Sequence, residues 1–301
     1  MNLANLSTKD LTELLEQRVT GLKVQSSEIR GGQRRVFVGS IGKKTYALKV
    51  FKGYSDALVR AQRELATLKK CTSQHVVKPG PFDLIQLTES EEDESGGEEP
   101  GALWLYVEEF VEGESLRQRL LRGPLTLPEA FQLALECLDG IEALWWKKRV
   151  HRDLKPANIM IRSSDNAFLI IDVGYVLVLD SSRVTSPHLA VGTPGYMPPE
   201  QFSGRSPRVD FRADIFGLGA CVYEALTGQQ PFRRPGDNKE DVLNRTLKET
   251  PPPPAKVRLD TPPCLSEIVL RMLAKRPHLR PRNVPTLRKE LEQCRDKGAQ
   301  T

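Results

Sequence analysis

The segment Val150–Met160 holds the densest group of chemically versatile side chains in the sequence. It places a carboxylate, an amine and an amide within six residues, at Asp153, Lys155 and Asn158. A second carboxylate, Asp172, follows the next strongly apolar run. The apolar residues around both carboxylates predict short strands that hold a polar loop in place. Two carboxylates and an amide at neighbouring strand ends would form an oxygen-rich site for Mg²⁺, which commonly bridges to substrate phosphates.

A lysine and a glutamate further upstream could add phosphate binding. Lys49 lies in the strand-like pattern Thr45–Phe51, and Glu64 lies in the helical pattern over residues 56–70. An ion pair between strand and helix would hold the lysine ammonium in position for a phosphate. Each residue alone would be an ordinary surface charge.

Composition excludes several classes of function. With 39% hydrophobic and 28% charged residues, the 301-residue chain has the composition of a soluble globular protein of one large domain or two lobes. The net charge of +5 is small and the basic residues are scattered, so no nucleic-acid partner is expected. No signal peptide, lipidation motif or membrane-spanning window is visible, and we expect a cytoplasmic protein.

The cysteines indicate a reducing environment. They are odd in number, far apart and lack a Cys-x-x-Cys pair, so we expect reduced, mostly buried thiols and neither a disulfide framework nor a zinc site. They are Cys71, Cys137, Cys221, Cys264 and Cys294.

The elements that must position these residues begin with an extension over residues 1–21. Its pattern predicts a helix over residues 7–18, with Ser7 as N-cap and Asp10 in the first turn, that packs on the following domain; recruitment of a partner is the alternative. A strand-rich lobe over residues 22–109 follows, in which residues 89–100 form an acidic surface loop. Strands are expected at Leu22–Ile29, Arg35–Gly39, Thr45–Phe51, 82–87 and 102–111, with the helix at 56–70.

Residues 110–295 form a mainly helical lobe, and residues 296–301 form a tail. The run Pro251–Pro254 predicts a rigid connector between helices, with a polyproline ligand as the alternative. Helices are expected at 114–122, 128–148, 211–227, 238–248, 263–274 and 284–295. The fold class is therefore α+β.

The motifs together resemble the protein kinase family. Residues with the family's order and spacing are Lys49, Glu64, His151, Arg152, Asp153, Asn158, Asp172 and Glu200. The resemblance covers roughly residues 22 to 290. It implies a bilobal fold with a small antiparallel β-sheet N-lobe, one key helix in that lobe and a larger helical C-lobe. It also implies ATP and Mg²⁺ as cofactors and proteins as substrates.

The resemblance assigns the chemistry to the segment described first. Asp153 resembles the catalytic base that accepts the proton of the substrate hydroxyl, and Lys155 would neutralise charge on the γ-phosphoryl group. Asn158 and Asp172 would coordinate Mg²⁺.

Nucleotide binding is assigned to the N-lobe. Lys49 resembles the lysine that binds the α- and β-phosphates, and Glu64 resembles its ion-pair partner. The other expected nucleotide contacts are Gly31, Gly32, Val36, Ala47 and Glu109.

The acceptor is expected to be serine or threonine. Lys155, two residues after Asp153, is the Ser/Thr version of the catalytic loop, and the stretch 192–200 resembles the end of a Ser/Thr-kinase activation segment. Thr193 in that stretch would bond near Asp153 and Lys155. The stretches 195–200 and 214–219 resemble bacterial eukaryotic-like Ser/Thr kinases in particular.

Structural roles are expected at four positions. Glu200 would pair with Arg280, and Asp214 would anchor the backbone of the catalytic loop. Arg152 often meets a phosphate on the activation segment in this family, which predicts autophosphorylation; its alternative is a structural hydrogen-bond donor. The candidate acceptors are Ser181, Ser182, Thr185 and Ser186.

The nucleotide loop departs from the family pattern. Gly-x-Gly-x-x-Gly-x-Val would align with residues 29–36, where Ile29 and Arg34 replace two glycines and only Gly31 is retained. Because glycines let backbone N–H groups approach phosphate, this loop is expected to lie less closely on ATP. We expect Arg34 and Arg35 to be exposed, and electrostatic compensation for the missing glycines by either arginine is the alternative.

Three further positions differ from the family. Val173 replaces the usual Phe after Asp172 and would keep an apolar plug there. Glu108 falls where a pocket-lining residue is usually apolar, unless the alignment slips by one residue. Arg276 replaces the Asp usually found before Pro277.

These features favour an active protein Ser/Thr kinase. A pseudokinase acting as a nucleotide-binding regulatory or scaffold module is the alternative, and the poor glycine loop favours it. A small-molecule phosphotransferase is disfavoured, because the activation segment is complete up to Glu200.

Overall fold

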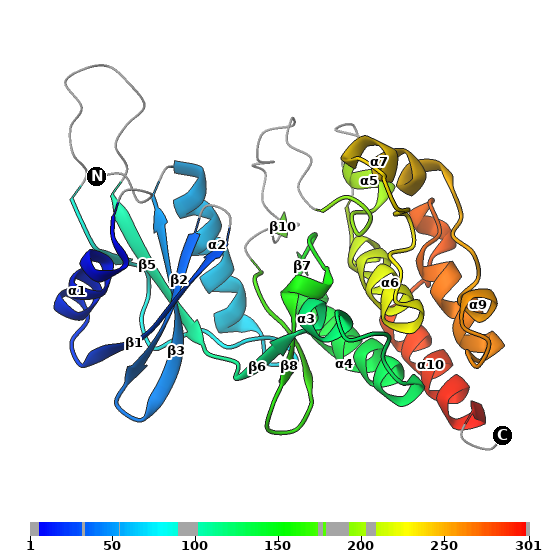
Figure 1. Ribbon diagram of the computed structural model, residues 1–301, viewed down its shortest axis with the longest axis horizontal. Coiled ribbons are helices and arrows are strands. Elements are labelled where there is room, and N and C mark those ends of the chain that lie inside the picture. The colour runs from blue at the N-terminus through cyan, green and yellow to red at the C-terminus, as the bar shows by residue number, and fades with distance from the viewer. Residues whose placement is uncertain are drawn as a thin grey trace. The chain divides into compact units, whose positions relative to one another are not determined.

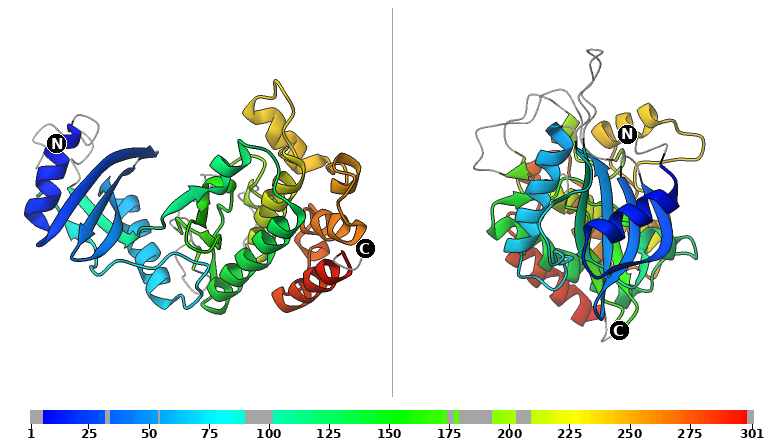
Figure 2. Two further views of the ribbon diagram at one scale, coloured as in Figure 1. Left: turned by 60° about the horizontal axis from the view of Figure 1, so that its bottom comes forward. Right: turned by 90° about the vertical axis from the view of Figure 1, so that its left-hand side faces the viewer.

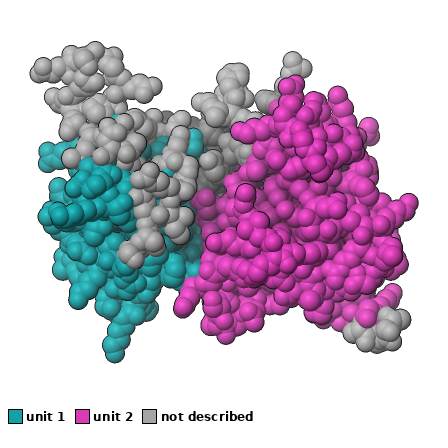
Figure 3. All heavy atoms as spheres, in the orientation of Figure 1, with its two compact units in different colours: residues 1–70, 77–111 teal, residues 71–76, 112–301 magenta. Residues whose placement is uncertain are grey.

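The structure is a computed structural model that describes residues 6–31, 34–53, 55–89, 102–173, 177–178, 193–202 and 209–298. It divides into two units (Figure 3). The first unit comprises Met1–Lys70 and Val77–Val111, and the second comprises Cys71–Val76 and Glu112–Thr301. In sequence order, a sheet-rich unit is thus followed by a helix-rich one.

Within its described residues, the first unit is a five-stranded antiparallel sheet with two helices (Figure 1). The strand order is β1-β2-β3-β5-β4. The elements are α1 (Thr8–Arg18), β1 (Leu22–Gly31), β2 (Arg34–Ile41), β3 (Lys44–Lys52), α2 (Ser55–Lys70), β4 (Ile85–Gln86) and β5 (Leu103–Glu109). The expected strand at 82–87 is reduced to the two residues of β4.

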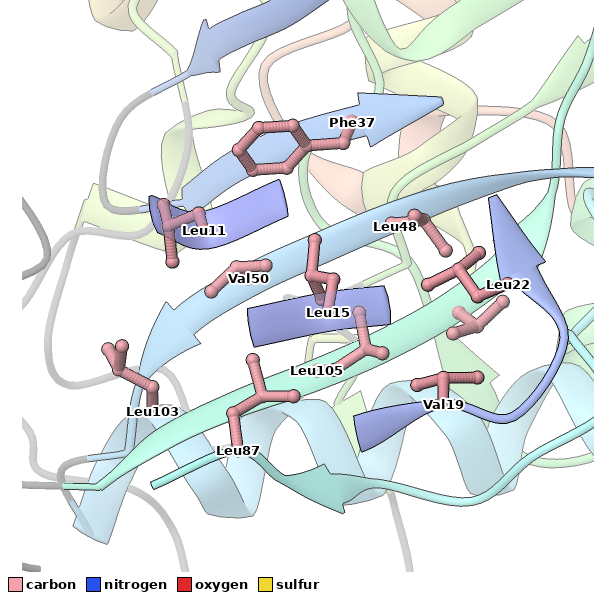
Figure 4. Close-up of a cluster of buried hydrophobic side chains, with 11 residues drawn as sticks. Leu11, Leu15, Val19, Leu22, Phe37, Leu48, Val50, Leu87, Leu103 and Leu105 are labelled. Carbon is pink, nitrogen blue, oxygen red and sulfur yellow. The ribbon is translucent and has the colours of Figure 1, made fainter. Parts of the chain in front are cut away.

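Alternation along β3 separates the two faces of this sheet. Leu48 and Val50 are fully buried in a hydrophobic cluster, whereas Lys49 between them points to the opposite face, as the two-residue period of a strand requires. Helix α1 supplies Leu11 and Leu15 to the same cluster (Figure 4). One face of the sheet is therefore an apolar core, and the other carries the functional charge.

Helix α1 begins as the sequence predicts. The Ser7 hydroxyl accepts the Asp10 N–H and the Asp10 carboxylate accepts the Ser7 N–H, each at 3.1 Å, which satisfies two donors at the helix start. The expected packing of this helix on the following domain is confirmed by full burial of Leu11 and Leu15.

The described part of the second unit is mainly helical with two small sheets. The sheets have strand orders β6-β8-β9 and β10-β7. The strands are β6 (Gly113–Ser115), β7 (Arg149–Val150), β8 (Ile159–Arg162), β9 (Phe168–Ile170) and β10 (Leu177–Val178). The helices are α3 (Leu116–Leu120), α4 (Leu127–Trp146), η1 (Pro156–Asn158), α5 (Pro199–Phe202), α6 (Arg212–Thr227), α7 (Lys239–Lys248), α8 (Pro254–Val257), α9 (Pro263–Met272), η2 (Pro277–Leu279) and α10 (Val284–Gly298).

Helix α6 is the centre of the second unit. It contacts α4, α8 and α9, and α10 packs against α4 and α9 (Figure 2). Its residues are apolar on almost every side, which is typical of a helix enclosed by others. The one carboxylate in its first turn, Asp214, is buried with it, and this places a charge inside the core.

The expectation that all the cysteines are reduced is wrong for one pair. Cys264 and Cys294 form a disulfide that links α9 to α10, with their Cα atoms 5.8 Å apart. The packing of these two helices brings together residues that are 30 positions apart, and spacing in the sequence gives no sign of it. Cys71, Cys137 and Cys221 are buried, as expected.

The sequence predicts no membrane-spanning segment, and such a segment would have to be a long apolar helix. Within the described ranges, none of the helices has the apolar length that a bilayer crossing requires.

Candidate active site

The backbone of the catalytic-loop segment is held by Asp214 at the start of α6. Its carboxylate accepts the N–H groups of His151 and Arg152, both at 2.8 Å. Burial raises the pKa of the Asp214 carboxyl above its ordinary value, and His151 and the two N–H donors oppose this shift. These two bonds fix the chain just before Asp153.

Arg152 adopts a strained backbone that its neighbours stabilise. Its φ of +72° lies in the left-handed region, which costs a non-glycine residue roughly 1–3 kcal/mol. Besides Asp214, the Gln201 side chain holds it by donating to the Arg152 carbonyl at 3.0 Å. Its side-chain Nε is buried and has no hydrogen-bond partner in the part of the chain that the structure describes. Burial lowers the pKa of this guanidinium, and Asp214 opposes the shift.

Asp153 is the point on which three side-chain donors converge. Lys155 Nζ lies 2.7 Å from Asp153 Oδ2, and the Thr193 hydroxyl donates to Oδ1 at 3.3 Å. Lys155 Nζ also contacts Thr193 Oγ1 at 3.0 Å. The Asn158 amide donates to Oδ2 at 3.1 Å and to the Asp153 carbonyl at 2.9 Å. The carboxylate is thus kept in one orientation while remaining 3% exposed.

Asn158 and Asp172 are brought to the same place by two paired strands. Asn158 directly precedes β8, β9 ends two residues before Asp172, and Ile159 pairs with Ile170 across these antiparallel strands. The Ile171 N–H donates to the Asn158 carbonyl at 2.9 Å. The two side chains predicted to bind metal therefore lie at one end of a single hairpin.

The donor set at this end fits Mg²⁺. Because the Asn158 amide nitrogen bonds to Asp153, its side-chain oxygen is the atom left for a cation, and Asp172 adds a carboxylate. Within the described ranges, no group of three or more His, Cys, Asp or Glu residues could hold a metal by itself. An amide oxygen and a carboxylate are oxygen ligands of the kind that Mg²⁺ uses, together with substrate phosphates and water.

Two neighbouring features support the position of Asp172. Its φ of +59° lies in the left-handed region, as does that of Arg152. Val173 is 1% exposed, so the expected apolar plug is present. His151 is fully buried, accepts the Asp153 N–H and contacts the Ile171 carbonyl, which is a packing role.

Lys49 in the first unit has two carboxylate neighbours. Its Nζ lies 3.6 Å from Glu64 Oε1 and 2.7 Å from Glu108 Oε1. The expected contact with Glu64 is present, but Glu108 is nearer. Glu108 is paired with Ala47 in the β3–β5 register and its side chain is 5% exposed. The register thus places Glu108 on the face of the sheet that carries Lys49.

The expected exposure of Arg34 and Arg35 is also wrong. Arg34 is partly buried because it donates to Glu64 Oε2 at 2.9 Å. Arg35 is 6% exposed because strand alternation turns it towards α1, where it donates to the Leu6 carbonyl at 2.6 Å and to Thr8.

The remaining nucleotide-contact candidates lie on different parts of the sheet. Val36 pairs with Lys49 in the β2–β3 register, and Ala47 lies two residues from Lys49, so all three share one face. Glu109 pairs with Tyr46, so it lies on the opposite face of the sheet. Gly31 ends β1, whereas Gly32 lies outside the described residues.

Glu200 and Arg280 form a bidentate ion pair, with distances of 2.6 and 2.9 Å. The Arg280 side chain is 0% exposed, and the Glu200 side chain is 9% exposed. The candidate phosphate acceptors Ser181, Ser182, Thr185 and Ser186 lie outside the described residues.

Comparison with known proteins agrees with this geometry. The family model of the protein kinase domain matches residues 31–291. The chain belongs to the protein kinase family. Kinases of this family generally use ATP and Mg²⁺.

Two of the similar proteins are kinases of mycobacteria. Serine/threonine-protein kinase PknB of Mycolicibacterium smegmatis is 35% identical over 194 residues, which are 64% of this chain and 30% of that protein. Serine/threonine-protein kinase PknD of Mycobacterium tuberculosis is 32% identical over 256 residues, which are 82% of this chain and 36% of that protein. The chain thus spans about a third of the length of these curated relatives. The resemblance to bacterial Ser/Thr kinases and the α+β kinase fold are confirmed.

Sequence reasoning missed three contacts of this kinase domain. It did not predict the approach of Glu108 to Lys49, the bond from Gln201 to the catalytic loop, or the bond from the Tyr196 hydroxyl to Glu224. The unusual glutamate at position 108 was a signal for the first contact. The residues of the other two contacts belong to no motif that sets them apart.

Proposed function

We propose that this chain is an ATP-dependent protein serine/threonine kinase that transfers the γ-phosphoryl group to Ser and Thr hydroxyls of proteins. The observation that carries the proposal is the convergence of Lys155 and Thr193 on the two oxygens of Asp153. A lysine at this position and a threonine from the activation segment are the features that distinguish Ser/Thr kinases in the sequence resemblance. The names of the similar mycobacterial kinases support the same acceptor class.

Asp153 is proposed to accept the proton of the substrate hydroxyl. Its carboxylate is held in one orientation by Lys155, Thr193 and Asn158, so little reorganisation is needed when the hydroxyl binds. Lys155 is close enough to Asp153 to neutralise charge that develops on the transferred group.

Nucleotide and metal are assigned to a small set of residues. Lys49 would contact the nucleotide phosphates, with Glu64 as one partner. Asn158 and Asp172 would hold Mg²⁺, which supplies positive charge that offsets the developing charge on the phosphates when it is bound. Each assignment rests on the resemblance together with the contacts described above.

The test is phosphate transfer from labelled ATP in the presence of Mg²⁺. We expect the wild-type chain to label itself or a generic protein substrate on serine and threonine, and chelation of Mg²⁺ should abolish labelling. Asp153→Asn and Lys49→Ala should each remove the activity. Labelling of tyrosine alone, or equal labelling by wild type and Asp153→Asn, would refute the proposal.

A pseudokinase that binds nucleotide and regulates a partner is the second candidate. It is favoured by the short distance between Lys49 and Glu108, which engages the phosphate-binding lysine, and by Arg34 at a glycine position. Nucleotide binding without transfer to any substrate would select this candidate.

Autophosphorylation of the activation segment is proposed as a property of the active kinase. The buried Nε of Arg152 supports it, because a phosphate would supply the acceptor that this donor needs. Mass mapping of active protein should find phosphate within residues 175–193, and active protein without phosphate there would refute the idea. The cytoplasmic location expected from the sequence stays a prediction.

A further inference from the structure

Four charged side chains from four elements of the first unit meet around Lys49. Lys49 on β3 lies 2.7 Å from Glu108 on β5 and 3.6 Å from Glu64 on α2. The second oxygen of Glu64 accepts a bond from Arg34 on β2 at 2.9 Å. The four side chains carry two positive and two negative charges.

Burial makes these contacts strong. The exposed fractions are 9% for Lys49, 5% for Glu108 and 0% for Glu64. Charges that are shielded from water interact through a lower effective dielectric, so each added or removed charge is felt by the others. Arg34, at 22%, is the most exposed member.

The sheet register makes the Glu108 contact a fixed feature of the fold. Ala47 is directly opposite Glu108, and Tyr106 is directly opposite Lys49. Residues two apart on a strand share a face, so Lys49 and Glu108 are diagonal neighbours on the face that also carries Val36. A carboxylate therefore lies beside the ammonium without any rearrangement of the backbone.

The two carboxylates around Lys49 are not equivalent. Glu64 is also bound by Arg34, so its charge is balanced whether or not Lys49 stays with it. Glu108 is the nearer carboxylate, with its Oε1 2.7 Å from the ammonium. An anion that approaches Lys49 must share the ammonium with Glu108 and is also repelled by it.

We propose that Glu108 competes with the nucleotide phosphates for Lys49 and so sets the part of nucleotide affinity that depends on phosphate. This inference rests on the proposed function, because it takes Lys49 as the phosphate-binding lysine. Glu108 acts through Lys49 and is a specificity residue rather than a catalytic one. Glu108 lowers the affinity for a ligand in proportion to the phosphate charge that the ligand places near Lys49. The affinity for an uncharged nucleoside is unaffected.

The first test compares the binding of Mg²⁺–ATP and of adenosine to wild type and Glu108→Gln by calorimetry. Glutamine keeps the shape and an acceptor oxygen but removes the negative charge. We expect ATP to bind about tenfold more tightly, or ~1.4 kcal/mol, and adenosine to bind with unchanged affinity. Asp83→Asn is the matched control, because it removes an exposed carboxylate of the same unit, paired with Lys69, and should change neither affinity.

A second variant has the opposite expected sign. Arg34→Gln leaves Glu64 without its balancing guanidinium, so Glu64 should draw Lys49 more strongly and ATP should bind more weakly.

Glu108→Asp retains the charge but shortens the side chain by one methylene, and it should give an ATP affinity between those of wild type and Glu108→Gln. This variant also covers the case in which Glu108→Gln does not fold.

The outcomes separate this inference from the proposed function. If Glu108→Gln binds ATP no better than wild type, or gains as much for adenosine as for ATP, the competition is refuted even in an active kinase. If ATP binding tightens but neither protein transfers phosphate, the competition stands and the kinase proposal fails. If neither protein binds ATP, both are refuted.

Discussion

Breaking the Glu200–Arg280 ion pair should destabilise the second unit strongly. Arg280→Met removes a guanidinium that is 0% exposed and leaves the carboxylate of Glu200, 9% exposed, without its bidentate partner. It also removes donors to three backbone carbonyls, those of Arg212 and Ala274 at 2.8 Å and that of Lys275 at 3.3 Å. Loss of the bidentate partner of a buried carboxylate is the main cost.

The expected magnitude follows from this burial. Removing one partner of a buried pair costs about 3–5 kcal/mol. For a unit of this size each kcal/mol lowers the midpoint of thermal unfolding by about 2–4 °C, so the midpoint should fall by about 6–20 °C. The unfolding midpoint is measured by calorimetry at neutral pH. Arg295→Met, which breaks an exposed pair with Asp296, is the control and should change it little.

A double variant tests the reasoning more sharply than the single one. Glu200→Gln combined with Arg280→Met removes both charges, so it should recover part of the stability lost by Arg280→Met alone. A midpoint within 2 °C of wild type for Arg280→Met, roughly 1 kcal/mol or less, would refute the claim that this pair carries buried charge. The claim would also be refuted if the double variant lost more stability than the two single variants lose when their losses are added.

Three further predictions concern other parts of the chain. Asp214→Asn should lower the phosphate-transfer rate at least tenfold with little change in ATP affinity, because His151 and Arg152 donate to different oxygens of Asp214 and asparagine replaces one of these oxygens by an NH₂ donor; an unchanged rate would contradict this anchoring role. Leu15→Ala should destabilise the first unit by about 2–5 kcal/mol in denaturant unfolding, since the side chain is fully buried, and a loss below 1 kcal/mol would contradict the packing of α1. Burial lowers the pKa of Lys275 to about 7, so the unfolded chain binds more protons than the folded one between about pH 7 and 10.5 and this residue makes stability rise with pH there. Lys275→Met should therefore be stabilising relative to wild type at pH 6 and less so at pH 10, and equal differences at both pH values would contradict the shift.

Local features were predicted well because their partners are close in sequence. The capping box of Ser7 and Asp10 spans one helical turn, and its bonds are present as expected. The loop from Asp153 to Asn158 is equally local, and its side chains meet as the motif implies. The β8–β9 hairpin then delivers Asp172 to the same place, which the apolar runs on both sides indicated.

Features that depend on strand register or helix packing were not predictable. The approach of Glu108 to Lys49 requires the pairing of β3 with β5, two strands separated by a helix and an acidic run. The link between Cys264 and Cys294 requires α9 and α10 to pack side by side. In both cases the sequence shows the residues but not their distance, because tertiary packing determines it.

Burial of charge was the other source of error. Arg35 was expected to be exposed, yet strand alternation turns it onto the buried face, where the Leu6 carbonyl and the Thr8 hydroxyl accept its donors. Arg34, on the alternate side of β2, reaches Glu64 for the same geometric reason. The alternation of side chains along β2 distinguishes the two arginines, whereas their charge does not.

The single-turnover rate of phosphate transfer by wild type and Asp153→Asn, at saturating Mg²⁺–ATP, tests the central claim most directly. We predict that the substitution slows transfer to a Ser or Thr acceptor by roughly 10²–10⁴-fold, the usual contribution of a positioned base, and leaves ATP affinity nearly unchanged. A rate for Asp153→Asn within tenfold of wild type would contradict the assignment of this loop as the catalytic centre.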